Sequence, residues 1–228
     1  MTILTNSKKS LVIAHKLTVS NKILKDNKMD YLVSRAKMES DDENEEENTP
    51  KSVTIRFLKK YGYDVTNLDS ITELTLSGKD IDDVSPLSTL TNLHILDLSN
   101  NNIVDVSPLS TLTNLQTLYL GDNKIGDVSP LSTLTKLQTL SLSVNNIVDI
   151  SSLKTLTKLQ TLWLTNNYIE DISPLNTLTK LQQLFLTNNY IEDISPLNTL
   201  INLQELELSN NKIVDVSPLR TLNARIYN

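Results

Sequence analysis

The chain has 228 residues, with 27 acidic and 21 basic side chains, a formal net charge of −6 and no cysteine. The negative charge disfavours binding to a nucleic-acid backbone or an anionic membrane surface. The missing thiols exclude disulfides, thiolate metal sites and cysteine nucleophiles.

The N-terminus does not have the pattern of an exported or membrane-inserted protein. Its one apolar patch, Leu11 to Ala14, is followed at once by His15 and Lys16, which makes a poor secretory signal. No stretch of the sequence approaches the run of about 20 apolar residues that a spanning helix needs. We therefore expect a cytoplasmic protein without membrane insertion, with export by another route left open.

Residues 1–48 divide by charge into two segments. Residues 1–38 carry eight Lys or Arg against two Asp, whereas residues 39–48 carry seven acidic residues and no apolar one. A run of like charges repels itself and buries too little surface to fold. We predict a flexible acidic linker at 39–48, preceded by a loosely ordered basic arm at 1–38; docking of the arm on an acidic surface is the alternative.

Residues 49–70 are predicted to form an N-terminal cap with a helix. Thr49 suits the N-cap, Pro50 the first helical position and Gly62 the C-terminal end. The spacing of Val53, Phe57 and Tyr61 places them on one face, which we expect to be buried. An array of repeats needs its first hydrophobic edge covered, and this helix would cover it.

From about Ile71 to Leu222 the sequence repeats every 22 residues. One copy shows the pattern, with Leu115, Leu118, Leu120, Asn123 and Ile125 at fixed offsets. We predict seven repeats within residues 71–228, each with a parallel strand whose alternate residues are buried. Their strand segments begin at Ile71, Leu93, Leu115, Leu137, Leu159, Leu181 and Leu203. The final LRTLNARIYN is too short for another full copy, so we expect a thinly capped C-terminal edge.

Three polar columns accompany the apolar ones. An asparagine follows each strand after the first, where the amide can satisfy buried turn groups: Asn101, Asn123, Asn145, Asn167, Asn189 and Asn211. Ser-Pro, as in Ser107-Pro108, predicts a short helical turn with serine as the cap. The aspartate before it, Asp105 in that copy, either contributes to a cation site or hydrogen-bonds its own turn, and we favour the second interpretation.

The pattern L-x-x-L-x-L-x-x-N resembles the leucine-rich repeat. The 22-residue length and the phrase D-[VI]-S-P-L resemble the internalins, bacterial proteins that bind host surface receptors through a concave face. The resemblance implies an α/β solenoid, a right-handed coil with a parallel concave sheet, short 3-10 turns on the convex side and a helical cap. It also implies that the six asparagines form a ladder.

The functional prediction is a binding surface and not an active site. The histidines, His15 and His94, have no catalytic partner in the pattern, and no cofactor or metal motif is present. In contrast, the open strand positions vary between copies and carry large rings, which favour an interface. Mutual stacking of the rings within the sheet is the alternative. The predicted partner-binding residues are Tyr119, Trp163, Phe185, Asp97, Ile95, Gln183, Glu205 and Glu207.

Two further aromatic residues are left out of this prediction. Tyr168 and Tyr190 lie in an identical run, LTNNYIEDISPLNTL, at residues 164–178 and 186–200. A copied segment can carry a residue without any function. Our first hypothesis is therefore a non-enzymatic, intracellular module that binds a protein partner on the concave face. An internalin-like adhesin that binds a host receptor and a regulatory subunit of type 1 protein phosphatase are the alternatives.

Overall fold

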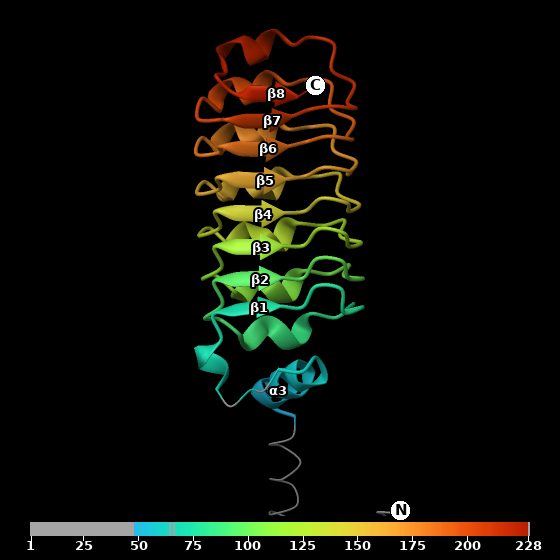
Figure 1. Cartoon of the computed structure of the whole chain (residues 1–228), viewed down its shortest axis with the longest axis vertical. Helices are drawn as coiled ribbons and strands as arrows, with labels where there is room; N and C mark the ends of the chain where they lie inside the picture. The colour runs from blue at the N-terminus through green and yellow to red at the C-terminus, as the bar shows by residue number, and fades with distance from the viewer. Residues whose placement is uncertain (1–47, 64, 66, 228) are drawn as a thin grey trace, which may run out of the picture. The chain divides into compact units, whose positions relative to one another are not determined.

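The computed structural model describes residues 48–63, 65 and 67–227. The predicted basic arm and all but the last residue of the acidic linker lie outside these residues. The repeats form a solenoid that begins after a helix, α3, at Pro50–Lys60 (Figure 1). Within the described part of the chain, no helix is long and apolar enough to cross a membrane.

Helix α3 packs on the first convex turn, η2 (Ser85–Thr89). Its buried residues are Thr54 and Leu58, and the Thr54 hydroxyl lies 2.6 Å from the carbonyl oxygen of Pro86. The predicted face, which Leu58 widens, is confirmed at Leu58 and in part at Phe57 and Tyr61, which are partly buried against the core, but it is wrong at Val53, which is exposed. A threonine can replace an apolar residue here because its hydroxyl is hydrogen-bonded.

The strands form one parallel sheet in sequence order. From β1 to β7, each strand residue pairs with the one 22 positions later, as Leu96 does with Leu118. The central leucine of every strand from β1 to β7 points into the core. The strands are β1 Glu73–Thr75, β2 Ile95–Asp97, β3 Thr117–Tyr119, β4 Thr139–Ser141, β5 Thr161–Trp163, β6 Gln183–Phe185, β7 Glu205–Glu207 and β8 Arg225–Tyr227.

An eighth strand, β8, follows the strands of the seven predicted repeats and lies in the short C-terminal end. Ile226 pairs with Leu206, only 20 residues earlier. The final coil thus omits two residues before its strand, which removes the L-x-x-L-x-L spacing. Its hydrogen bonds are still made, since the Leu208 amide donates to the Tyr227 carbonyl at 2.8 Å.

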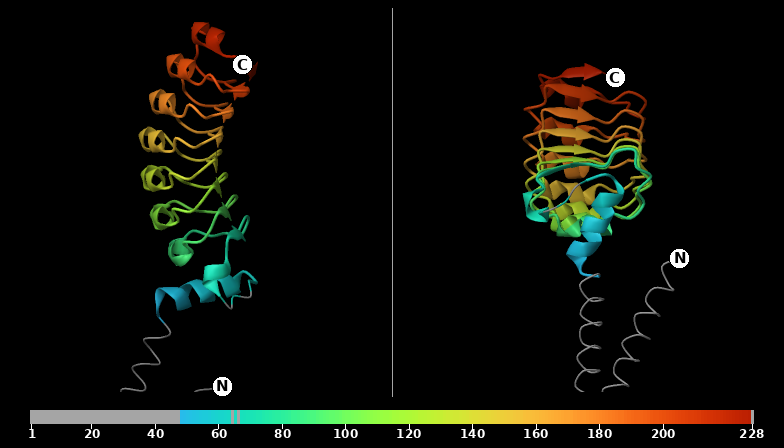
Figure 2. Two further views of the ribbon diagram at one scale, coloured as in Figure 1. Left: turned by 90° about the vertical axis from the view of Figure 1, so that its left-hand side faces the viewer. Right: turned by 60° about the horizontal axis from the view of Figure 1, so that its bottom comes forward.

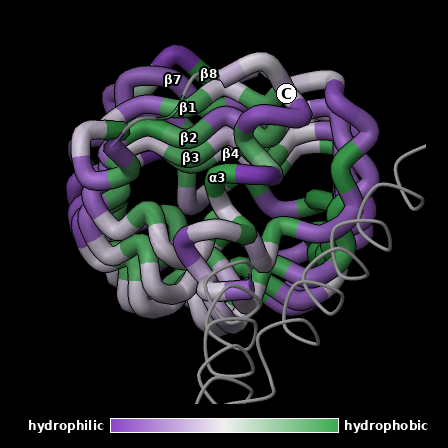
Figure 3. Tube along the Cα trace, turned by 90° about the horizontal axis from the view of Figure 1, so that it is seen from below, coloured by the Kyte–Doolittle hydropathy of each residue, from purple (hydrophilic) through white to green (hydrophobic). Residues whose placement is uncertain are grey.

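On the opposite side of each coil lies a five-residue 3-10 helix (Figure 2). The sheet forms the concave face and these turns form the convex face. Between them the leucines, isoleucines and valines form one hydrophobic core, with most members fully buried. Figure 3 shows that hydrophobic and hydrophilic residues alternate along the stacked coils. After η2, the turns are η3 Ser107–Thr111, η4 Ser129–Thr133, η5 Ser151–Thr155, η6 Ser173–Thr177, η7 Ser195–Thr199 and η8 Ser217–Thr221.

The aspartate two residues before each 3-10 helix, and not the serine, accepts hydrogen bonds at the start of the helix, an arrangement that we call the aspartate cap. Asp105 accepts hydrogen bonds from the Ser107 backbone N–H at 2.8 Å and from the Ser107 hydroxyl at 2.9 Å. The same pair of bonds recurs in all seven turns. The predicted serine cap is therefore wrong: serine is the first helical residue, and proline is the second. The aspartates serve their own turns, as the favoured interpretation expected.

The asparagine column joins consecutive coils. Asn145 accepts a hydrogen bond from the Ile125 backbone N–H of the preceding coil at 3.0 Å. Its amide group also donates to the carbonyls of Leu120, in that coil, and Leu142, in its own coil. The other five asparagines repeat this arrangement, and Asn101 also accepts from the backbone N–H of Lys79, the residue that replaces asparagine in the first copy.

The residue before each ladder asparagine has a left-handed backbone. The column contains Asn100, Asp122, Val144, Asn166, Asn188 and Asn210, together with Gly78 before Lys79 in the first copy, all with φ between 55° and 66°. Glycine, asparagine and aspartate tolerate this region, whereas a β-branched residue is strained there. Val144, with φ of 57° and 46% exposure, is the exception.

We expect Asn145→Ala to lower the free energy of unfolding by about 3 kcal/mol, because several buried backbone groups lose their partner at about 1–3 kcal/mol each. Urea denaturation measures this. Asn146→Ala, at the exposed neighbouring position, is the matched control and should change stability by less than about 0.5 kcal/mol. Equal effects at the two positions would contradict the ladder's structural role.

We expect Val144→Asn to raise the free energy of unfolding by about 1 kcal/mol, because asparagine tolerates the left-handed backbone. Thermal and urea unfolding both report the change. Val148→Asn, in the same coil and 60% exposed, is the control and should be nearly neutral. A variant no more stable than the wild type would show that the frame already absorbs the strain.

The aspartate caps predict acid sensitivity. The backbone hydrogen bond from Ser107 and then its hydroxyl hold the pKa of Asp105 below the usual value of 3.8. The pKa of Asp215 is lowered likewise, chiefly by the Ser217 backbone N–H. The pKa of each carboxyl is lower in the folded protein than in the unfolded chain. The hydrogen-bonded carboxylate therefore stabilises the fold at any pH above its unfolded-state pKa, and this stabilisation is lost as the pH falls through its folded-state pKa.

We therefore expect the double variant Asp105→Asn, Asp215→Asn to lose less stability than the wild type between about pH 4 and about pH 2. The measurement is urea unfolding across this range. At neutral pH the double variant should be the less stable protein, because the neutral amide accepts weaker hydrogen bonds. Parallel pH profiles for the two proteins would refute the assignment.

Candidate protein-binding surface

Two columns of side chains cover the concave face. The last residues of successive strands form one column, so that Asp97 pairs with Tyr119 and Trp163 with Phe185. The first residues form the other, so that Ile95 pairs with Thr117 and Gln183 with Glu205. All eight residues predicted to bind a partner therefore lie in these two columns.

The aromatic members of the first column form a stack, which we call the aromatic ladder: Tyr119, Trp163 and Phe185. The Trp163 and Phe185 rings are stacked, with centroids 5.6 Å apart and planes 10° apart. The Tyr119 ring lies 6.5 Å from the Trp163 ring across the intervening Ser141 strand, tilted by 44°. Each of the three residues is half-buried. The rings thus stack on one another and still present part of their surface to solvent.

A polar chain runs beside the ladder. The Thr161 hydroxyl lies 3.2 Å from the Gln183 Oε1 atom, and the Gln183 Nε2 atom donates to the Glu205 carboxylate at 2.9 Å. Glu207 follows Phe185 in the other column, and its carboxylate lies 3.5 Å from the Thr187 hydroxyl. The C-terminal end of the ladder is therefore bordered by two carboxylates on strand β7.

The structure separates the other two predicted residues from this acidic end. Asp97 and Ile95 lie on β2, beyond Tyr119, with strands β3 to β6 between them and Glu205 and Glu207. The Asp97 carboxylate accepts a hydrogen bond from the Ser99 backbone N–H at 2.9 Å. Its first role is thus in its own turn, although its charge remains near Tyr119.

Sequence reasoning missed the last strand's contribution to this face. Arg225 pairs with Glu205, and Tyr227 pairs with Glu207, so both extend the two columns. The alternation of polar and apolar residues at Arg225, Ile226 and Tyr227 is the sequence pattern that indicates this strand. Because the final coil is two residues shorter, these residues do not align with the 22-residue repeat. The pair Tyr168 and Tyr190, which sequence reasoning set aside, is also exposed, on the side of the coils.

The described residues offer a surface for contact and not a metal centre. Over residues 48–63, 65 and 67–227, no group of three or more His, Cys, Asp or Glu side chains is placed to hold a metal ion. His94 is exposed beside β2. Its backbone carbonyl accepts from the Gln116 and Thr117 amides and so belongs to the sheet.

Known families and structures match the repeats. The family model for leucine-rich repeats, which spans two copies, matches at residues 69–111, 91–133, 113–155, 135–177 and 179–221. No curated protein matches the chain at a significant level.

Three solved structures illustrate the likeness. An internalin, InlF, from Listeria monocytogenes is 39% identical, with a TM-score of 0.71 over 76% of this chain and 53% of that one. Internalin C2 from the same bacterium is 34% identical, with a TM-score of 0.66 over 78% of this chain and 93% of that one. A leucine-rich repeat protein from Leptospira interrogans is 25% identical, with a TM-score of 0.56 over 69% and 49%. The chain thus spans about half the length of the InlF structure.

The fold and these neighbours support a protein-interaction module in general, a class whose members are typically non-enzymatic. The chain belongs to the leucine-rich repeat family, and its 22-residue repeats are of the internalin type.

Proposed function

We propose that the chain is a non-enzymatic module that binds a protein partner on the concave face, with the aromatic ladder as the central contact. The observation that carries this proposal is the ladder itself: three half-buried rings that lie on a face that the fold leaves open. Large aromatic side chains dominate the binding energy of protein interfaces.

The repeat does not need these rings. Ser141 occupies the same strand position as Trp163, and the strand Thr139–Ser141 has the same length and pairing as its neighbours. Thr75 and Asp97 fill that position in the first two strands. Because the buried leucines and the ladder asparagines already hold the coil, a ring at this position contributes little to the fold. Mutual stacking adds only about 0.5–1.5 kcal/mol per aromatic pair.

The charges suggest where the partner's cations lie. Glu205 and Glu207 border the ladder on one side, and Asp97 borders it on the other. A partner surface with an apolar centre and basic residues around it would complement both the hydrophobic ladder and the charges at its two ends. Such charges at a rim mainly steer association and select partners.

A second candidate function is that of an internalin-like adhesin that binds a host receptor through the same face. The likeness to InlF and internalin C2 favours it. It differs from the first candidate in where the partner resides, and not in the residues that would contact the partner.

We expect the triple variant Tyr119→Ser, Trp163→Ser, Phe185→Ser to retain the fold and to lose partner binding at least about tenfold, because hot-spot rings contribute about 2 kcal/mol or more each. Serine is the residue that the repeat itself carries at Ser141. The measurement is affinity capture with the full chain, followed by titration of the captured protein against wild type and variant.

The matched control is Val104→Ser, Val148→Ser, which removes two exposed apolar side chains that lie away from the concave strands. Capture from the organism's own lysate would support the first candidate, and capture from a host-cell membrane fraction would support the adhesin. A partner that binds the wild type and the ladder variant equally would refute both.

A further inference from the structure

The turns that follow the strands form a second exposed surface, which we call the flank: Val144, Asn146, Asn166, Tyr168 and Tyr190. The two tyrosines are 49% and 42% exposed, and their rings are stacked with centroids 6.1 Å apart and planes 12° apart. They occupy equivalent positions in adjacent coils, with Asn146 and Lys212 in the coils before and after them.

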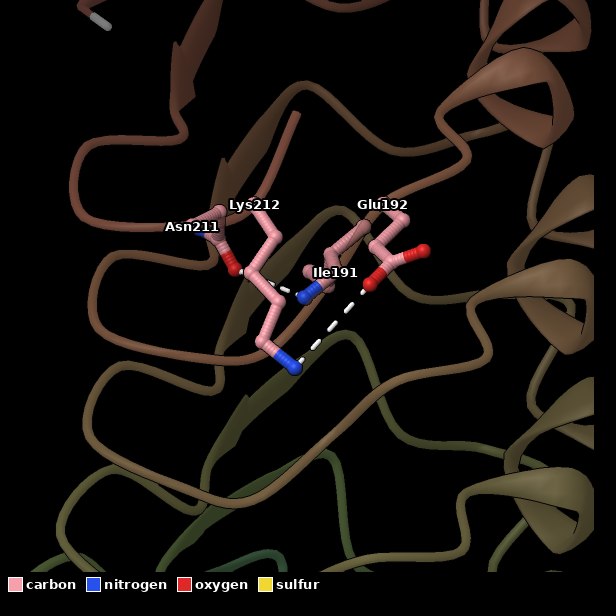
Figure 4. A network of polar contacts seen from close by, with 4 residues as sticks. All are labelled: Ile191, Glu192, Asn211 and Lys212. Carbon is pink, nitrogen blue, oxygen red and sulfur yellow. Dashed lines mark hydrogen bonds and ion pairs between the residues drawn. The ribbon is translucent and has the colours of Figure 1, made fainter. Parts of the chain in front are cut away.

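A cation already closes one end of this stack. The Lys212 ammonium lies 5.1 Å from the centre of the Tyr190 ring and 3.9 Å from the Glu192 carboxylate. Figure 4 shows the Lys212 side chain reaching back from its own coil toward Glu192 in the preceding one. The flank therefore accommodates an alkyl-ammonium side chain against a tyrosine face, with a carboxylate beside it.

The other end of the stack is open. A groove of about 390 Å³ lies there, lined by Tyr168, Val144, Asn146, Asn166 and neighbouring asparagines. In the described part of the chain, no ring and no cation lies over the outer face of Tyr168 as Lys212 lies over Tyr190.

Val144 shapes this groove at a cost in local geometry. Asn210 donates to Asn188, and Asn188 donates to Asn166, at 2.7 and 2.6 Å between side-chain amides. The chain of amides stops at Val144, which has no acceptor, so the Asn166 Nδ2 group has no side-chain acceptor within the described residues. An apolar wall and a hydrogen-bond donor thus adjoin the open tyrosine face. A backbone held in such a strained conformation by the surrounding structure is a reason to look for a function at that position.

Four carboxylates lie near the Tyr190 end of the stack. A neighbouring cavity of about 340 Å³ beside Tyr190 is lined by Glu170, Asp171, Glu192 and Asp193. Asp171 and Asp193 accept hydrogen bonds from Ser173 and Ser195, which fix their carboxylates in place. Of the four carboxylates, Glu192 is paired with Lys212. The groove at Tyr168 is itself lined by neutral side chains. A cationic occupant is favoured by the open Tyr168 ring, by the position of Lys212 on Tyr190, and by Glu170, which follows Tyr168 by two residues as Glu192 follows Tyr190.

We propose that the flank is a docking site for a basic segment of a protein partner. A Lys or Arg side chain of the segment lies against the outer face of Tyr168, with its aliphatic stem on Val144, as Lys212 lies against Tyr190. The Asn166 amide donates to a backbone carbonyl of the segment. This site is independent of the concave face, so either can exist without the other.

The test uses the full-length protein and three probes, the capped tetrapeptides Ala-Arg-Val-Ala, Ala-Glu-Val-Ala and Ala-Ala-Val-Ala, in nitrogen-15 NMR titrations. We expect the arginine peptide to shift the Asn146 and Asn166 side-chain amides, and the glutamate peptide to leave them unchanged. Raising salt from about 50 mM to about 500 mM should weaken binding, because a cation is attracted to exposed carboxylates.

Two variants locate the site. Val144→Asn should weaken the arginine peptide about threefold or more, because it removes the apolar wall and gives Asn166 an acceptor. Since this variant is expected to be the more stable protein, lost binding cannot reflect unfolding. Tyr168→Ala should abolish the shifts, whereas Trp163→Ser on the concave face should leave them unchanged.

Three outcomes would overturn the proposal. The first is equal binding of the arginine and glutamate peptides, and the second is equal binding by wild type and Val144→Asn. The third is self-association of the free protein that disappears in Val144→Asn while no peptide shifts the flank, which would assign the surface to a second copy of the chain. If the ladder variant binds the captured partner as well as the wild type does, the proposal for the concave face is refuted, but the result of the peptide titrations is unaffected.

Discussion

The hydrogen bonds of the asparagine after each strand are the contacts on which the rest of the structure depends. Asn167 accepts from the Ile147 amide of one coil and donates to carbonyls of both that coil and its own. In a solenoid each repeat contacts only its neighbours, so order along the stack must pass through such pairwise contacts. Because one asparagine side chain hydrogen-bonds the backbone of two consecutive coils, a change in repeat length between them would break these hydrogen bonds. The 22-residue period and the strand register are therefore two aspects of one constraint.

The fixed register between strands brings residues that are distant in sequence together on one surface. Trp163 and Phe185 are 22 positions apart in sequence and stack only because their strands pair residue for residue. The same holds for Tyr168 and Tyr190 on the flank. The core and the asparagines carry the stability, and the concave and lateral positions are left free to vary. Two different faces can then acquire binding chemistry without any change in the fold.

The period predicted the coil, the strand register and the columns of the concave face from sequence, because each depends on residues at equal spacing. The errors arise where a residue contacts a different element of the chain, or where a coil departs from the 22-residue spacing. Thr54 is buried because of a hydroxyl contact with Pro86, which no helical periodicity reveals. Ile226 was missed because the final coil is two residues shorter. Serine was given the capping role of Asp105 because Ser-Pro is also a typical start of an ordinary helix.

Departures from the repeat fall into two physical kinds, and the fourth copy contains both. Ser152 replaces the proline of the other turns, and its hydroxyl donates to the Val128 carbonyl of the preceding coil at 3.2 Å. The turn keeps its length, so this departure is compensated. Val144 replaces asparagine or aspartate in a left-handed turn, gains no hydrogen bond and ends the amide chain. A compensated departure indicates drift within a tolerant frame. An uncompensated one, beside an open aromatic face, is the pattern expected where a surface serves something other than the fold.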